Sequence, residues 1–126
     1  MFHFKLTLQI THTNFMDKIR EVIFYRHYFR DFYNSQTTKV QEKIDYVIFL
    51  LGHIERIPSK FLKHIEGRKG LYELRIESGS NIFRIFCCFD GGNIVVLFNG
   101  FQKKTQKTPL NEIDEAVRLR KDYFNE

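Results

Sequence analysis

Three segments in the second half of the chain carry the clearest pattern of hydrophobic and polar positions. β-branched and aromatic residues dominate segments 71–77, 81–90 and 94–99. Ser78-Gly79-Ser80 joins the first two segments, and Gly91-Gly92 stands between the second and the third. Joins this short connect neighbouring antiparallel strands. The pattern therefore predicts a three-stranded antiparallel meander.

The first half of the chain predicts one strand followed by two helices. Residues 22–25 form an uninterrupted β-branched and aromatic run, which indicates a buried strand over 21–26. A short helix is expected over 27–33. A longer helix begins at Thr38, because Thr38 and Gln41 form a capping-box pattern. Its hydrophobic positions recur at helical spacing at Val40, Ile44, Val47, Ile48 and Leu51.

A closing helix is expected near the end of the sequence. Thr108 is a favourable N-cap, Pro109 fits the first helical position, and Glu112 places negative charge near the positive end of the helix dipole. The hydrophobic stripe expected for this helix is Ile113, Ala116 and Val117, with Tyr123 or Phe124 at its end. Segments 59–70 and 101–108 are basic and are interpreted as loops.

These elements together indicate one α+β domain. In it an N-terminal strand and two helices pack on an antiparallel meander, and a C-terminal helix closes the fold. Residues 2–10 also alternate hydrophobic and polar positions, as a strand does, and a second methionine follows at Met16. Residues 1–15 are therefore interpreted as an N-terminal extension, an edge strand or the product of an early start codon, and residues 16–126 as the main domain.

Charge narrows the class of partner. The 126 residues carry a net charge of +5 and give a pI near 9.3. A positive surplus favours a polyanionic partner such as RNA, DNA or an acidic protein segment. The alternative is a basic domain whose charge serves only solubility.

Cysteine usage and hydropathy predict a cytoplasmic protein without metal. Cys87 and Cys88 are adjacent in a predicted strand, so they point to opposite faces and fit a reducing compartment rather than a disulfide scaffold. The five histidines are scattered without ligand spacing, so we expect no metal and no other cofactor. No hydrophobic run approaches the roughly 18 residues of a membrane span, and the first residues do not form a signal peptide.

Two arginines are expected on one face of the meander. Side chains of a strand point alternately to its two faces, so Arg75 lies opposite the hydrophobic side of segment 71–77. Arg84 interrupts the hydrophobic run of segment 81–90. If the purely hydrophobic sides pack on the helices, Arg75 and Arg84 face outward together. A charge among large hydrophobic neighbours costs stability unless it is paired or solvated. Arg84 therefore either pairs with Glu73 or Glu77 as a structural residue or has a functional role.

The basic segment 101–108 is a candidate RNA contact. It contains Lys103, Lys104 and Lys107 without an acidic residue, and it opens on Phe101. Lysines can contact phosphates while an aromatic ring stacks on an unpaired base. The alternative is a solvated loop with Phe101 in the core.

The inventory of side chains restricts the chemistry that a nuclease could use here. The sequence has no Gly-rich phosphate loop at a strand-to-helix junction, no serine nucleophile elbow, and no histidines and carboxylates at metal spacing. RNA can be cut without metal when its own 2′-OH is the nucleophile and protein groups move protons and balance charge. Arginine, lysine, histidine and glutamate are adequate for that.

Three stretches resemble a known family of toxins. They read GLYELR at 70–75, NIFRIF at 81–86 and GFQKKTQKTP at 100–109. They are similar to the phage-derived, HigB-like branch of the RelE/ParE toxin superfamily, and the order of predicted elements agrees with it over about 19–123. The resemblance implies a toxin of a type II toxin-antitoxin system that cleaves messenger RNA on the ribosome. It also implies a helix-turn-helix, HigA-like antitoxin as partner, with operator DNA bound only through that antitoxin.

The resemblance also implies roles for individual residues. The family's sheet arginine falls on Arg84, expected to stabilise charge at the scissile phosphate, and Arg75 is expected to position that phosphate. Glu73 is the hypothetical general base, and the proton donor is Lys103, Lys104 or His64. RNA binding is assigned to the remaining basic and aromatic candidates, which are Lys63, His64, Arg68, Lys69, Phe101 and Lys107.

Two other functions stay open from the sequence. A ParE-like toxin uses the same fold to inhibit gyrase without nuclease chemistry. A non-catalytic partner of a helix-turn-helix DNA-binding protein would need none of the catalytic residues. The nuclease hypothesis requires that Arg75 and Arg84 share one side of the sheet and are accessible to a phosphate.

Overall fold

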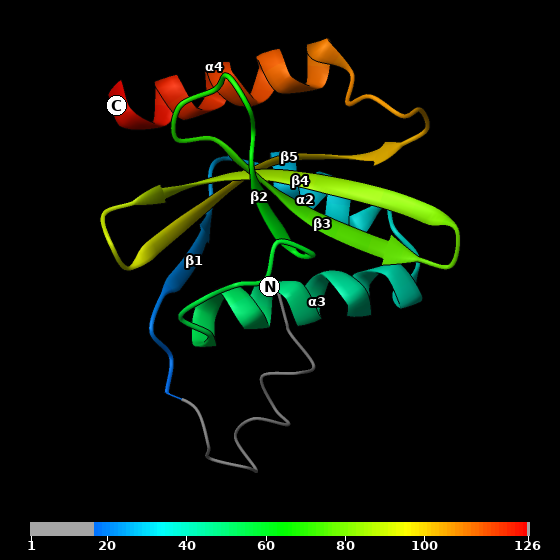
Figure 1. Cartoon of the computed structure of the whole chain (residues 1–126), viewed down its shortest axis with the longest axis horizontal. Helices are drawn as coiled ribbons and strands as arrows, with labels where there is room; N and C mark the ends of the chain where they lie inside the picture. The colour runs from blue at the N-terminus through cyan, green and yellow to red at the C-terminus, as the bar shows by residue number, and fades with distance from the viewer. Residues whose placement is uncertain (1–16, 126) are drawn as a thin grey trace.

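The chain folds into a mixed five-stranded sheet with helices on both faces (Figure 1). The structure is a computed structural model that describes residues 17–125, and the expected extension over 1–15 lies outside the described residues. The elements are β1 (Glu21–Phe24), α2 (Tyr28–Asn34), α3 (Thr38–His53), β2 (Leu62–His64), β3 (Tyr72–Ser78), β4 (Asn81–Asp90), β5 (Ile94–Lys103) and α4 (Leu110–Asn125). The predicted α+β class is confirmed.

The predicted meander forms the centre of the sheet. The strand order is β1-β5-β4-β3-β2, in which β3, β4 and β5 are antiparallel neighbours and β1 runs parallel to β5. The short strand β2 pairs with β3 inside the segment expected to be a basic loop. That expectation is wrong. A strand of three residues is too short to show an alternation of hydrophobic and polar positions in the sequence, and its pairing with β3 is a tertiary contact.

Strand β5 is longer than the sequence predicts. It runs to Lys103 because β4 is itself ten residues long and offers partners for the extra residues, with Phe101 opposite Arg84 and Lys103 opposite Ile82. Gly100 keeps this part of the strand close to α2, since a Cβ atom there would lie 2.6 Å from the Phe32 ring. The segment expected as a loop over 101–108 therefore begins as a strand.

Both faces of the sheet are hydrophobic, and each supports its own core. Phe83, Ile85 and Cys87 of β4 point toward α2 and α3, whereas Phe86 and Cys88 point toward α4. The adjacent cysteines are thus free thiols buried in different cores. Burial raises the pKa of the Cys88 thiol to about 11 and that of Cys87 further. The α4 side of the meander is consequently a covered face rather than an open one.

The helices begin close to the predicted residues. The N-cap of α3 is Thr37, whose side chain accepts a hydrogen bond from the Val40 amide at 3.3 Å, so the cap predicted at Thr38 is wrong by one residue. The cap predicted at Thr108 is also displaced, since the first helical hydrogen bonds of α4 run to the Pro109 carbonyl.

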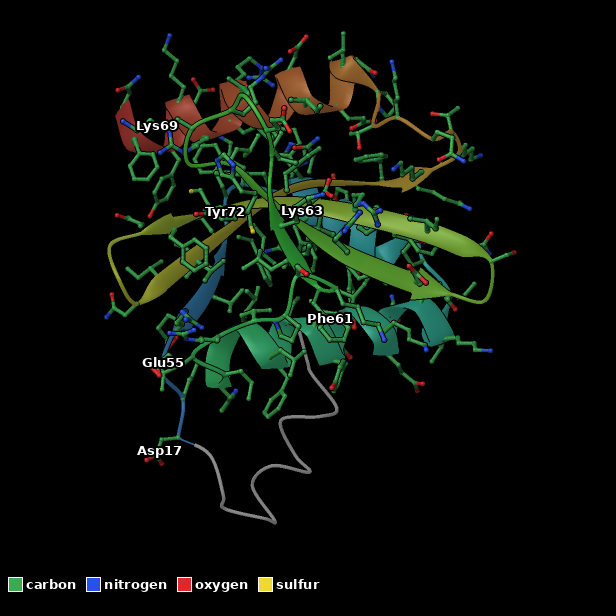
Figure 2. All side chains as sticks on the ribbon, viewed as in Figure 1. Asp17, Glu55, Phe61, Lys63, Lys69 and Tyr72 are labelled. Carbon is green, nitrogen blue, oxygen red and sulfur yellow. The ribbon has the colours of Figure 1, made fainter. Side chains whose placement is uncertain are left out.

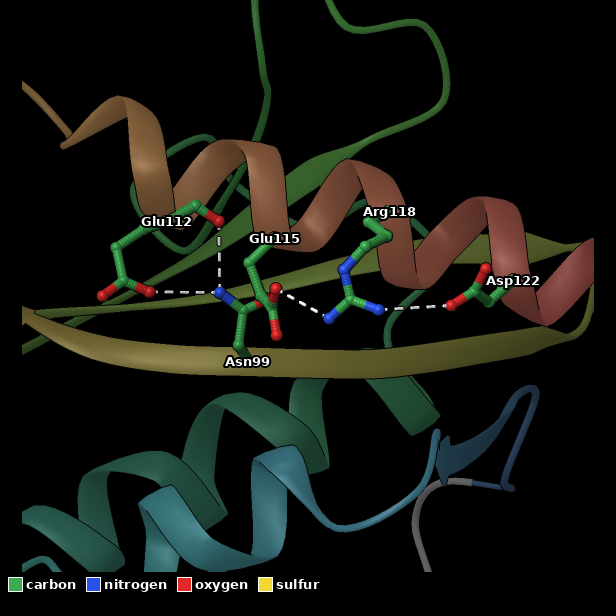
Figure 3. Close-up of polar contacts among 5 residues, drawn as sticks. All are labelled: Asn99, Glu112, Glu115, Arg118 and Asp122. Atoms are coloured by element: carbon green, nitrogen blue, oxygen red, sulfur yellow. Dashed lines mark hydrogen bonds and ion pairs between the residues drawn. The ribbon is translucent and has the colours of Figure 1, made fainter.

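Helix α4 is fixed on the sheet by Asn99 of β5. The Asn99 side-chain amide donates to the Glu112 backbone carbonyl at 3.1 Å and to the Glu112 carboxylate at 3.2 Å (Figure 3). Ala116 and Leu119 are the buried residues of the helix, whereas Val117, predicted for its hydrophobic stripe, is exposed. The described residues contain no helix that combines the length and hydrophobicity needed to cross a bilayer.

We expect the Tyr123→Phe variant to lose about 1 kcal/mol of unfolding free energy at neutral pH, because it removes one hydrogen bond. The Tyr123 hydroxyl donates to the Asp90 carboxylate at 2.6 Å, and this bond raises the phenol pKa from 10.0 to about 12. Stability from a raised pKa is present below the unfolded value and is lost as pH rises from 10 toward 12. Urea unfolding should show the two proteins converging over that range, and a constant difference would contradict the assignment.

Candidate functional site

The two arginines of the meander are direct neighbours across the sheet. Arg75 of β3 and Arg84 of β4 are paired in the register, and both lie on the side that α4 covers in part. The expectation that they share one side is therefore confirmed. Two like charges directly opposite each other are destabilising unless a counter-charge lies between them.

Glu73 supplies that counter-charge. Its Oε2 atom lies 3.3 Å from Nε of Arg75 and 3.5 Å from Nε of Arg84. The Glu73 side chain is 9% exposed, the Arg84 side chain 5% and the Arg75 side chain 31%. The three residues thus form a layered arrangement, with a shielded carboxylate and guanidinium below and one guanidinium at the surface.

The expectation that Arg84 faces outward is wrong, so the requirement that both arginines are accessible to a phosphate is met by Arg75 alone. Its guanidinium is buried because α4 packs on this face of the meander, and β4 carries hydrophobic residues on both of its sides. Burial lowers the pKa of Arg84, and the charge of Glu73 partly opposes that shift. The guanidinium donates a hydrogen bond, at 3.2 Å, to the Phe83 carbonyl, and within residues 17–125 its Nε atom has no hydrogen-bond partner. A buried cation with so few partners is costly to the fold.

Two lysines complete the charged group. Lys103, at the end of β5, has a pKa lowered first by partial burial and then by the charge of Arg84. Lys63 of β2 is exposed and is paired with Glu73 in the register. Figure 2 shows Lys63 on β2, beside the middle of the sheet. We use the name cationic cluster for Lys63, Arg75, Arg84 and Lys103 together with Glu73.

The cationic cluster has the chemistry of an anion site. Arg75, Lys103 and Lys63 are the members that solvent reaches, while Glu73 and Arg84 lie beneath them. Guanidinium and ammonium groups on adjacent strands can hold a phosphate by charge-assisted hydrogen bonds. The described residues contain no group of three or more histidine, cysteine, aspartate or glutamate side chains arranged to hold a metal ion.

The structure separates several predicted site residues from the cationic cluster. His64 packs edge-on against Tyr72, which belongs to the α3 side of the sheet, so His64 cannot donate a proton beside Glu73. Phe101 is buried with its ring stacked on Phe86, so the prediction that it offers a surface to RNA is wrong. Lys104 is exposed just after the end of β5.

The remaining predicted RNA contacts also lie elsewhere. Arg68 and Lys69 line a cavity of about 420 Å³ between the β2–β3 connection and α4, together with Arg120 and Lys121. Lys107 is exposed in the connection before α4. Arg68, Lys69, Arg120 and Lys121 therefore form a second positive region beside α4, apart from the cationic cluster.

Sequence reasoning missed a group of residues beside Arg75. Lys43 and Tyr46 of α3 lie with Lys60 and Phe61 around a cavity that reaches Arg75. Tyr46 is 42% exposed and lies off the hydrophobic stripe of α3. A large aromatic residue off the buried stripe was the available signal.

The fold, a five-stranded mixed sheet with α2 and α3 on one face and α4 on the other, is consistent with a RelE-like α+β domain. The family described as Phage derived protein Gp49-like (DUF891) matches residues 31–121, which is more than half of the chain. The chain therefore belongs to this phage-derived family, which is part of the RelE/ParE-like toxin superfamily. The matched span contains the whole cationic cluster. No curated protein matches the chain.

We expect Glu73→Ala to lower the unfolding free energy by about 3 kcal/mol, because it leaves the buried Arg84 without its counter-charge. Arg84→Met should cost less, and the double variant should recover part of the loss of Glu73→Ala. Urea unfolding of the three variants measures the coupling between the two residues.

The matched control is Arg118→Met. Arg118 also contacts two carboxylates, Glu115 at 2.8 Å and Asp122 at 3.4 Å, but its side chain is 54% exposed (Figure 3). An exposed pair contributes about 1 kcal/mol or less. Purely additive effects of Glu73→Ala and Arg84→Met would contradict the coupling.

Proposed function

We propose that this chain is the toxin of a type II toxin-antitoxin system and that it cleaves messenger RNA on the ribosome without a metal ion. The observation that carries the proposal is the cationic cluster, in which three cations that solvent reaches lie above a shielded carboxylate on one sheet face. Membership of a toxin-like, phage-derived family supports the toxin part of the proposal. The HigB-like branch, the ribosome as the site of action and cytoplasmic location are further parts of the same proposal.

The reaction needs a base, an acid and charge stabilisation. The 2′-oxygen attacks phosphorus, the bond from phosphorus to the 5′-oxygen breaks, and the products are a 2′,3′-cyclic phosphate and a 5′-hydroxyl. Glu73 takes the 2′-OH proton, and since both of its ion pairs use Oε2, we assign that proton to Oε1. Arg75 contacts the phosphate and balances its growing negative charge.

Lys103 is the proton donor that the geometry supports best. Its pKa is lowered by partial burial and by the nearby positive charges of Arg84 and Arg75. A lysine that releases its proton more readily is a better acid for the leaving 5′-oxygen. Lys104 stays a candidate proton donor, because it directly follows Lys103 in the sequence.

Arg84 acts here as a positioning residue. Its side chain is 5% exposed, less than the 9% of Glu73, and its Nε atom ion-pairs with the same Glu73 oxygen as Arg75 does. We therefore replace direct phosphate contact by an indirect role, in which Arg84 fixes the orientation of the Glu73 carboxylate and lowers the pKa of Lys103.

The partner proposed for the silent state is a helix-turn-helix, HigA-like antitoxin. A toxin-like family suggests an antitoxin partner, and operator DNA would then be bound only through that partner. No contact surface is assigned to it.

The burial of Arg84 favours one alternative. A cluster whose central cation is shielded by a carboxylate suits a protein that binds rather than cuts, as a ParE-like gyrase inhibitor does. Purified protein that leaves ribosome-bound message intact and blocks gyrase supercoiling would establish this alternative in place of the nuclease.

We expect induction of the protein to arrest growth and to cut ribosome-bound message in a purified translation system. Arg75→Ala and Lys103→Ala should each lower the single-turnover rate by about 10²–10³-fold, because each removes one charge from the transition state. Lys121→Ala, a cation in the separate cavity beside α4, is the control and should cut at the normal rate. Full activity in a folded Arg75→Ala protein would contradict the assignment.

The pH profile tests the acid and base. Activity should fall as pH rises through the pKa of Lys103, which lies below the ordinary lysine value of 10.5. Lys103→Arg should move this fall to higher pH, because the guanidinium keeps its proton. Glu73→Gln should lose most of the rate, because the amide cannot accept the 2′-OH proton. An unchanged rate for Glu73→Gln would remove Glu73 as the base.

A further inference from the structure

Among the described residues, half of the β3 edge has no strand partner, and this half opens onto a cavity that reaches Arg75 of the cationic cluster. Strand β2 pairs with residues 72–74 of β3, and the last hydrogen bond between the two segments runs from the Arg75 amide to the Phe61 carbonyl at 2.8 Å. Beyond this bond a cavity of about 460 Å³ lies between the sheet edge and α3. We call it the edge cavity, and its lining includes Lys43, Tyr46, Lys60, Phe61, Arg75 and Glu77.

Two aromatic rings form one wall of the edge cavity. The centroids of Tyr46 and Phe61 are 5.8 Å apart and their planes meet at 73°. Phe61 packs against the α3-side core, and Figure 2 shows it close to α3. Tyr46, in contrast, is 42% exposed, so part of its ring is available to a ligand. A planar group can stack on one of these rings while its edge meets the other.

The cavity is also positively charged. Lys43, Lys60 and Arg75 line it against the single acid Glu77. The Lys60 ammonium lies 5.5 Å from the centre of the Phe61 ring, so the positive charge is held beside the aromatic wall. Aromatic rings together with cations are the usual platform for single-stranded nucleic acid.

Arg75 connects the edge cavity to the cationic cluster. Arg75 is one of the residues that line the cavity at the edge of β3, and its guanidinium is ion-paired with Glu73 at 3.3 Å. A phosphate held by Arg75 therefore has its neighbouring nucleotide at the mouth of the cavity. A volume of 460 Å³ lies within the usual range of small-ligand sites.

We propose that the edge cavity binds the base of a nucleotide next to the scissile phosphate. The inference rests on the proposed RNA substrate and adds a subsite to it. The base stacks on Tyr46, and the lysines of the cavity contact the following phosphate. This subsite would select unpaired RNA, because a base within a duplex cannot leave its stack to enter.

The test uses 2′-O-methyl RNA, which cannot be cut because its nucleophile is blocked. Binding of a short labelled strand is followed by fluorescence anisotropy at fixed salt, with wild-type protein and with Tyr46→Ala. We expect Tyr46→Ala to bind about tenfold more weakly, which is the usual effect of losing one stacking ring. Phe61→Leu, which keeps the core filled, should have a smaller effect in the same direction.

An abasic strand separates stacking from a general structural effect. Removing the base at the responsive position should weaken wild-type binding about tenfold and should leave Tyr46→Ala unaffected, because the ring has then lost its partner. The matched control is Phe124→Ala, whose ring is 44% exposed and lines the other basic cavity, beside α4. It should bind both strands as wild type does.

Several results would overturn the subsite. These are equal affinity of Tyr46→Ala and wild type, an equal loss in Phe124→Ala, or an abasic effect that persists in Tyr46→Ala. Normal RNA binding by Tyr46→Ala together with lost antitoxin binding would show that the cavity docks protein instead. Cleavage of ribosome-bound message by wild type is scored separately, so failure of the nuclease function and failure of the subsite are distinguishable.

Discussion

The interaction on which the rest of the site depends is the shared carboxylate of Glu73. One oxygen atom lies between two guanidinium groups that the sheet register places directly opposite each other. Without this carboxylate, the pairing of Arg75 with Arg84 would work against the pairing of β3 with β4. The fold thus keeps two cations together only by placing an acid between them, and the same acid limits how much positive charge reaches the surface.

The burial of Arg84 shows why a charged residue in a hydrophobic strand is difficult to interpret. Its neighbours in β4 point to two separate cores, so either orientation of its side chain would meet protein rather than water. A structural ion pair and a functional cluster were the two interpretations of this arginine. The structure shows the ion pair of Arg84 with Glu73, which is also the hypothetical base, and Arg75, the register neighbour of Arg84, remains partly exposed.

Local sequence predicted most of the fold and only part of the site. The meander, its two turns and the helices follow from hydrophobic periodicity and turn residues. Helix α3 begins at Thr38 as predicted, and only its N-cap, Thr37, differs by one residue. The site depends on contacts that have no local signal. Strand β2 places Lys63 beside Glu73 and sends His64 to the other face, and the pairing of β5 with β4 buries Phe101. Tyr46 of α3 lines the same cavity as Arg75 of β3, and the alternation of side chains within the strands could not indicate this contact.

The parallel pairing of β1 with β5 also affects when the sheet is completed during synthesis. Strand β1, near the start of the described chain, pairs with β5, the last strand in the sequence. This edge of the sheet therefore depends on contacts between residues that are far apart in the sequence. Such topologies fold slowly compared with those built from local contacts. Strand β5 also carries Lys103, and a nascent chain therefore has neither a complete sheet nor a complete charged surface until this strand has left the ribosome exit tunnel. The cationic cluster therefore forms only after nearly all of the described chain has been synthesised.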